Sequence, residues 1–184
     1  MLPIGPLMIE HRLIERMIQV MRKELQRFEK ERKADPIFVD MAVDFIRTYA
    51  DRCHHGKEED ILFRELSKKQ LVDEHKRIMD ELIEEHRWGR KTVGELVDAK
   101  EKYATGDSDQ LTTILDRMSA LVDFYPKHIE KEDKRFFLPC MEYFNEQEKG
   151  SMLSEGWEFD RRLIHEKYEN VVVNAEESLQ APNK

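Results

Sequence analysis

Cysteine, glycine and proline are all scarce in this chain of 184 residues, which contains 2, 7 and 6 of them. Two cysteines, Cys53 and Cys140, are too few for a disulfide framework, so the fold has to depend on a packed apolar core. Few residues break helices, whereas glutamate, lysine, leucine, methionine and arginine, which favour helices, are abundant. These features together predict an all-α protein.

Long hydrophobic runs and clusters of basic residues are also missing from the sequence. No apolar run approaches the roughly 20 residues that a membrane-spanning helix needs, and the N-terminal residues lack the basic region of a signal peptide. A formal net charge of −8, with no basic stripe, argues against nucleic acid as a partner. We therefore expect a cytoplasmic protein that binds neither nucleic acid nor membranes.

Apolar residues recur at spacings of three and four along four long stretches, which predicts four amphipathic helices. The expected helices cover residues 7–32, 36–66, 71–103 and 109–144. Because their connections are short, they predict an up-down-up-down four-helix bundle within residues 1–145. Residues 146–184 are expected to form a C-terminal extension, an appended helix around residues 158–175 that packs on the bundle.

A short passage occurs twice in the chain, at His54–Phe63 and at His128–Phe137. Each copy has a histidine, a lysine three residues later, a glutamate four residues later, and an apolar pair ending in phenylalanine. A histidine and a carboxylate four residues apart lie on one face of a helix, one turn apart. Two such pairs on two helices can hold metal between them, because imidazole and carboxylate together suit iron, zinc or manganese.

Each of the four long helices carries a histidine that could join such a site: His11, His54 or His55, His86, and His128. Because neighbouring helices alternate in direction, a residue near the start of the first helix can meet one late in the second. His86 lies in the middle of its helix and fits this placement less neatly. A single histidine is more commonly structural, but this constellation predicts a metal site.

These motifs resemble those of the hemerythrin-like, or HHE cation-binding, domains. Members of that family have a histidine on the first and third helices and His-x-x-x-Glu on the second and fourth. The matching residues here are His11, His54, Glu58, His86, His128 and Glu132. The resemblance covers about residues 7–144. It implies a four-helix bundle around two non-haem iron ions, bridged by the two glutamates and by an oxo or hydroxo group.

The second helix offers two overlapping pairs, His54 with Glu58 and His55 with Glu59. A helical wheel places the aromatic residues of that helix nearer the second pair. The internal repeat favours the first pair, because nine residues separate the histidine from the final phenylalanine in both copies. We adopt the repeat, since metal-site helices often contain bulges that defeat a wheel. His55 is then an extra ligand or supports one, and Glu59 and Asp133 become outer or surface acids.

The ligand set typical of oxygen-carrying hemerythrins has five histidines and two carboxylates, with His-x-x-x-His on the third helix. Here Arg90 stands four residues after His86, so the fifth histidine could be His55, could be His165, or could be missing. An open iron position would favour reactivity over plain reversible oxygen carriage. This apparent shortfall of histidines therefore points away from a simple carrier.

Iron with an open coordination position can bind dioxygen, peroxide or nitric oxide. The resemblance thus implies a protein that binds or senses one of these small oxidants, as a monomer or a homodimer. Two alternatives stay open: a di-iron enzyme or iron–sulfur-centre repair factor, and a bundle that stores metal without turnover. Whether the protein is an enzyme is left undecided. Tyr49 and Tyr125 could be bundle tyrosines or donors to a bound ligand, and Cys53 is expected to be a buried structural thiol.

Overall fold

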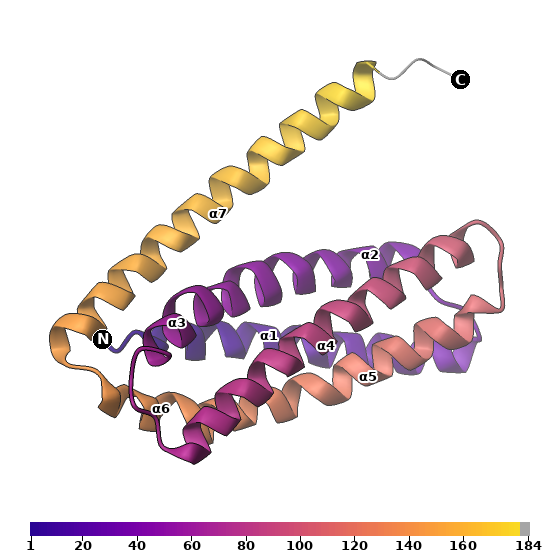
Figure 1. The fold of residues 1–184 in the computed structure, drawn as a ribbon. Coiled ribbons are helices and arrows are strands. Elements are labelled where there is room, and N and C mark those ends of the chain that lie inside the picture. The colour runs from indigo at the N-terminus through magenta and orange to yellow at the C-terminus, as the bar shows by residue number, and fades with distance from the viewer. Residues whose placement is uncertain (181–184) are drawn as a thin grey trace.

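The computed structural model describes the backbone of residues 1–180 and the side chains of residues 1–163. All regular structure in this part of the chain is helical, as the sequence predicts (Figure 1). In chain order the elements are α1 (Ile4–Glu31), α2 (Pro36–Phe45), η1 (Ile46–His55), η2 (Glu58–Phe63), α3 (Arg64–Leu66), α4 (Asp73–Ala104), α5 (Gln110–Lys131), η3 (Glu132–Phe136), α6 (Phe137–Cys140), η4 (Met141–Tyr143) and α7 (Glu146–Gln180). Of the helices described, none is long and apolar enough to span a bilayer.

Local signals set where the helices begin. Asp35 caps α2 by accepting a hydrogen bond from the backbone N–H of Ile37 at 3.0 Å, and Pro36 takes the first helical position. At the start of α7, Asn145 and Glu148 exchange side-chain-to-backbone hydrogen bonds of 2.9 Å. This reciprocal cap starts α7 well before residue 158, where the sequence prediction had placed the helix.

Two apolar cores lie on either side of a polar layer. One core gathers around Phe28, Leu96 and Leu121, and the other around Leu66 and Leu82. Each long helical segment passes from one core through the polar layer into the other. On α1, for example, Leu7 belongs to one core, Ile14 to the other, and Glu10 and His11 lie between them. The polar layer therefore lies between two apolar cores.

The segments η1, η2 and η3 are π-helical and lie where the chain crosses the polar layer. They interrupt the continuous helices that the sequence predicts over residues 36–66 and 109–144. A π-helix bonds each residue to the fifth one along, so its turn is wider than that of an α-helix. His54 and His55, although adjacent, are both buried there. Because the turn is wider, a wheel drawn with 3.6 residues per turn does not describe this segment, which explains its disagreement with the repeat.

Helix α7 contacts the rest of the molecule through its first half. The Arg64 guanidinium donates two hydrogen bonds, of 2.8 and 2.7 Å, to the carboxylate of Glu155. Towards its C-terminal end, α7 diverges from the other helices (Figure 1). The side chains of His165 and Tyr168 lie outside the described residues. The division of the chain at residue 145 stays a prediction.

Phe28 allows a test of the apolar packing, because its side chain is fully buried. Phe28→Ala should lower the free energy of unfolding by about 3–5 kcal/mol, through lost transfer energy and the cavity left behind. Ile37→Ala is the control, since Ile37 is 81% exposed and should change stability by less than about 0.5 kcal/mol. Chemical denaturation followed by circular dichroism measures both. Equal losses in the two variants would contradict this description of the core.

Candidate metal centre

All seven predicted site residues lie in the polar layer, and each is at most 3% exposed. They come from four long segments of the chain: His11 from α1, His54, His55 and Glu58 from the segment of η1 and η2, His86 from α4, and His128 and Glu132 from α5 and η3. The structure thus brings together side chains that are far apart in sequence.

The potential ligand atoms form two groups that share a carboxylate. In each group, one nitrogen or oxygen atom per residue lies within 4.8 Å of all the others. The two-histidine group contains His11, His54, Glu58 and Glu132. The three-histidine group contains His55, His86, His128 and Glu58. This pattern provides two adjacent positions for metal ions.

Both carboxylates turn one oxygen towards each group. Glu58 Oε1 lies 3.4 Å from His54 Nε2, and its Oε2 lies 3.4 Å from His86 Nε2. Glu132 is placed likewise, with each oxygen 3.2 Å from an Nε2 atom of one group. A carboxylate in this position is able to bridge two cations.

The inward-facing atoms have no hydrogen-bond partner among the described side chains. They comprise Nε2 of all five histidines and both oxygens of Glu58 and Glu132. A buried polar atom without a partner costs about 1–3 kcal/mol, so a purely structural core rarely collects several. Imidazole nitrogen and carboxylate oxygen are suitable donors for iron, zinc or manganese. The residues present therefore fit a metal centre.

The outward-facing Nδ1 atom of each histidine is bonded to an outer carboxylate. These pairs are His11–Asp133 (2.8 Å), His54–Glu10 (3.0 Å), His55–Asp51 (3.3 Å), His86–Glu59 (2.6 Å) and His128–Glu85 (2.7 Å). Such a carboxylate accepts the Nδ1–H, fixes the ring and leaves Nε2 free to bind metal.

Sequence reasoning found two of the outer acids and missed three. Glu59 and Asp133 lie where an outer acid was expected, whereas Glu10, Asp51 and Glu85 were not singled out. A partial signal was present, because Glu10 and Glu85 each directly precede a site histidine. Each of these glutamates, however, bonds to a histidine on another segment, and only the tertiary structure reveals that pairing.

The buried charges shift the pKa values of the histidines in opposite directions. Burial disfavours protonation of His11, but the carboxylates of Asp133 and Glu132 outweigh it and raise the pKa to about 9. The same competition at His128, where Glu132 is the main opposing charge, raises the pKa to about 10. Burial prevails at His54 and lowers the pKa to about 4.

The pKa values of the two central carboxyl groups, Glu58 and Glu132, are also shifted in opposite directions. Burial and the charge of Glu132 raise the pKa of Glu58 well above its ordinary value. Burial opposes ionisation of Glu132 as well, but the charges on His128 and His11 hold its pKa well below the usual range. Protons on Glu58, His11 and His128 therefore balance the charges of the metal-free centre, and an incoming metal has to displace them.

The geometry agrees with the ligand pair that the internal repeat favours. Glu58 is fully buried in the centre, whereas Glu59 lies outside it and accepts hydrogen bonds from His86 and Arg90. His55 also faces the centre, and its ring stacks on that of His86 with centroids 3.8 Å apart. His55 thus supplies a fifth imidazole from the second segment. With His55 included, the two ligand groups contain five imidazoles.

Three further residues near the motifs lie outside the ligand groups. Tyr125 is buried, and its ring lies nearly parallel to that of His55, with centroids 6.5 Å apart. Tyr49 stacks on Phe45. Cys53 is buried, and burial raises the pKa of its thiol to about 12, so it stays protonated as expected of a structural cysteine.

An all-helical fold with buried histidine and glutamate clusters defines a metal-binding helical protein. The model of the hemerythrin HHE cation binding domain matches residues 2–138, and the chain belongs to this family. No curated protein and no solved structure matches the chain. The family match ends before α7, so it covers every residue of the two ligand groups but not the C-terminal helix.

Replacing the central and the outer glutamate of the second segment should have unequal effects on metal binding. Glu58→Ala removes a carboxylate that faces both groups and should abolish binding of at least one metal ion. Glu59→Ala removes an outer acceptor that bonds to His86 and Arg90, and should weaken affinity by about 10–100-fold. Metal per chain after loading and desalting measures both, with circular dichroism to verify folding. A greater loss in Glu59→Ala would show that the wrong glutamate has been assigned to the centre.

Metal affinity should fall as the pH is lowered from 8 to 6. The pKa values of His11 and His128, about 9 and 10, keep both rings protonated across this window, so each must lose its proton when metal binds. Calorimetric titration with Zn²⁺ in buffers of different ionisation enthalpy should detect release of about two protons or more per chain. Affinity that is independent of pH would contradict these protonation states.

Proposed function

We propose that the protein is a non-haem di-iron protein that binds or senses a small oxidant: dioxygen, peroxide or nitric oxide. The observation that carries this proposal is the convergence of five ring nitrogens and four carboxylate oxygens, all buried and without a hydrogen-bond partner within the described part of the chain. Membership of the HHE family supports metal as their common partner. Iron bound by imidazole and carboxylate, with one position open, supplies the chemistry for binding such oxidants.

The two ligand groups suggest different tasks for the two metal positions. His55, His86 and His128 would hold one ion, His11 and His54 would hold the other, and Glu58 and Glu132 would contribute to both. The resemblance implies an oxo or hydroxo bridge in addition. The two-histidine group offers fewer nitrogen donors. An ion held by that group would therefore have more room for a further ligand.

The protein's own residues would hold this centre in a fixed geometry. The two apolar cores cover the polar layer on both sides. The outer carboxylates fix the five rings with Nε2 facing inward. A preorganised ligand set of this kind favours binding at defined positions over loose storage of metal.

The topology of the bundle is part of this proposal. We propose that the four long segments form an up-down-up-down bundle. Along α1 and α4 the chain passes from the core around Leu66 to the core around Phe28, and along the second and fourth segments it passes in the opposite order. A reducing cytoplasmic setting is consistent with two free, buried cysteines, Cys53 and Cys140.

Metal analysis combined with an absorption spectrum tests the proposal. Protein purified after growth with iron should contain about two iron ions per chain, following from the two ligand groups, and its oxidised form should absorb in the near ultraviolet. A colourless protein that contains zinc would contradict the di-iron assignment.

Cycles of anaerobic reduction and exposure to oxygen separate the functional alternatives. Repeated, stable recovery of the same spectrum would favour binding or sensing of the oxidant. Rapid catalytic loss of added peroxide would favour a di-iron enzyme, and bound iron that responds to neither treatment would favour storage. Glu132→Gln should abolish the absorption spectrum, whereas the control Asp116→Asn, at an exposed position of α5, should keep it. That difference would show that the spectrum arises from the metal centre.

A further inference from the structure

A line of charged side chains leads from α7 to one histidine of the centre. The Glu10 carboxylate accepts a hydrogen bond from His54 Nδ1 at 3.0 Å. The Lys57 ammonium donates to Glu10, and also to Asp160 of α7 at 2.7 Å. Lys57 is only 4% exposed and Glu10 only 8%. Charged side chains are rarely this buried unless they are paired, so these contacts are built into the fold.

The same residues do not form a further metal site. Glu10, Cys53 and Asp160 come close enough together to hold a cation. The Lys57 ammonium, however, already bonds to both carboxylates of this cluster. A lysine side chain is thus the resident cation, and the cluster joins α7 to the segment that carries His54.

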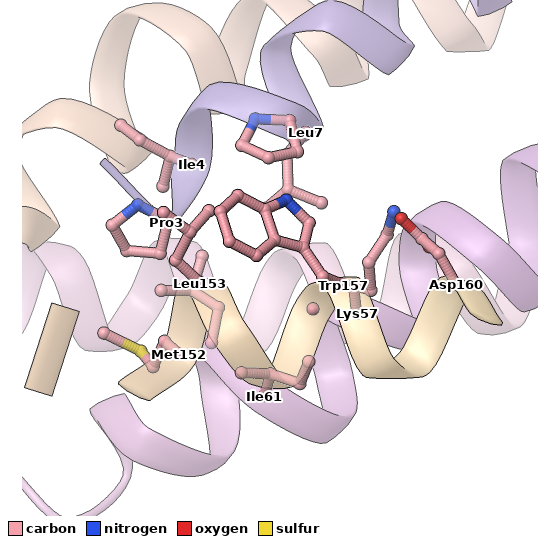
Figure 2. A pocket seen from close by; sticks show the side chains of 12 residues that line it. Pro3, Ile4, Leu7, Lys57, Ile61, Met152, Leu153, Trp157 and Asp160 are labelled. Atoms are coloured by element: carbon pink, nitrogen blue, oxygen red, sulfur yellow. The ribbon is translucent and has the colours of Figure 1, made fainter. Parts of the chain in front are cut away.

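Close packing of α7 beside Lys57 supports this connection. A Cβ atom added to Gly56 would lie 2.7 Å from Phe159 Cζ, closer than real contacts allow. Glycine therefore permits α7 to approach the chain next to His55. Figure 2 shows Lys57 and Asp160 together at one end of a largely apolar pocket between α7, the start of α1 and η2. Apolar walls reduce the local dielectric constant and strengthen the ion pair.

The other outer carboxylates also have cationic partners, but those partners belong to the bundle. Arg12 pairs with Asp133, Arg90 pairs with both Asp51 and Glu59, and Lys131 pairs with Glu85. Among the side chains that the structure describes, Lys57 is the one cation of this set that bonds to α7. The His54 side of the centre is therefore distinguished by its link to α7.

We propose that α7 positions the two-histidine group of the centre. Asp160 holds Lys57, Lys57 holds Glu10, and Glu10 fixes the ring of His54 with Nε2 facing inward. These three are positioning residues, and separation of α7 from the bundle weakens metal binding in the two-histidine group. Asp160 lies beyond the matched family domain, and the statement about metal rests on the proposed function above.

Asp160→Asn tests the link, because it keeps the side-chain size and removes the charge that holds Lys57. Glu155→Gln is the matched control: Glu155 also joins α7 to the bundle, through Arg64, but neither residue contacts a site histidine. The protein is loaded with Co²⁺, and a chelator then competes for the bound ions. Asp160→Asn should raise the dissociation constant of one of the two Co²⁺ ions about tenfold. The second ion, and both ions in Glu155→Gln, should be bound as in the wild type.

A double mutant shows whether Asp160 acts through Glu10. In a Glu10→Gln background, Asp160→Asn should add little further loss of affinity, because the contact that it supports is already broken. Additive losses would overturn the proposed linkage, as would equal affinities in Asp160→Asn and Glu155→Gln. Thermal melting of the metal-free variants provides the folding control. If the loss of bound metal in Asp160→Asn is fully explained by unfolded protein, the proposed linkage is also overturned.

Nitrogen NMR of the histidine rings tests the positioning without any metal. In the metal-free wild type, His54 should carry its proton on Nδ1, facing Glu10. Asp160→Asn should give a mixed tautomer at His54 and leave His86 unchanged. Unchanged His54 signals would overturn the role of α7 even if two ions bind. Failure of the wild type to bind two ions, with His54 still altered by Asp160→Asn, would contradict the proposed function alone.

Discussion

The rest of the structure depends on one constraint: nine polar atoms face one another in the interior with no hydrogen-bond partner within the described residues. At about 1–3 kcal/mol for each unpaired group, their combined cost is comparable with the net stability of a whole domain, about 5–15 kcal/mol. The raised pKa values of Glu58, His11 and His128 favour protons on these groups, which lower this cost in the metal-free protein. Metal ions at the two ligand groups would remove it.

Two features of the fold allow such a centre to exist. Apolar cores on both sides supply the burial energy that offsets the cost of the polar layer. Around the centre, every imidazole bonds to an acid, and these acids bond to cations, so each ring is fixed from outside. One such linkage, through Lys57, extends beyond the family domain to Asp160 on α7.

Much of this arrangement could be predicted from the sequence, and the remainder could not for identifiable reasons. Helical spacing and the repeated His-x-x-Lys-Glu passage predicted the all-α class, and they selected seven residues that the structure brings together. The π-helical turns could not be predicted, because a wheel with 3.6 residues per turn assumes a regular α-helix. Glu10 and Asp160 were missed because each acts across segments that are distant in sequence.

The most direct test of the central claim is anomalous diffraction at the iron edge from crystals of the iron-loaded protein. Two peaks per chain are expected, both between the carboxylates of Glu58 and Glu132, one beside His11 and His54 and the other beside the stacked ring of His55. A single peak, or a peak among Glu10, Cys53 and Asp160 in place of these, would contradict the central claim.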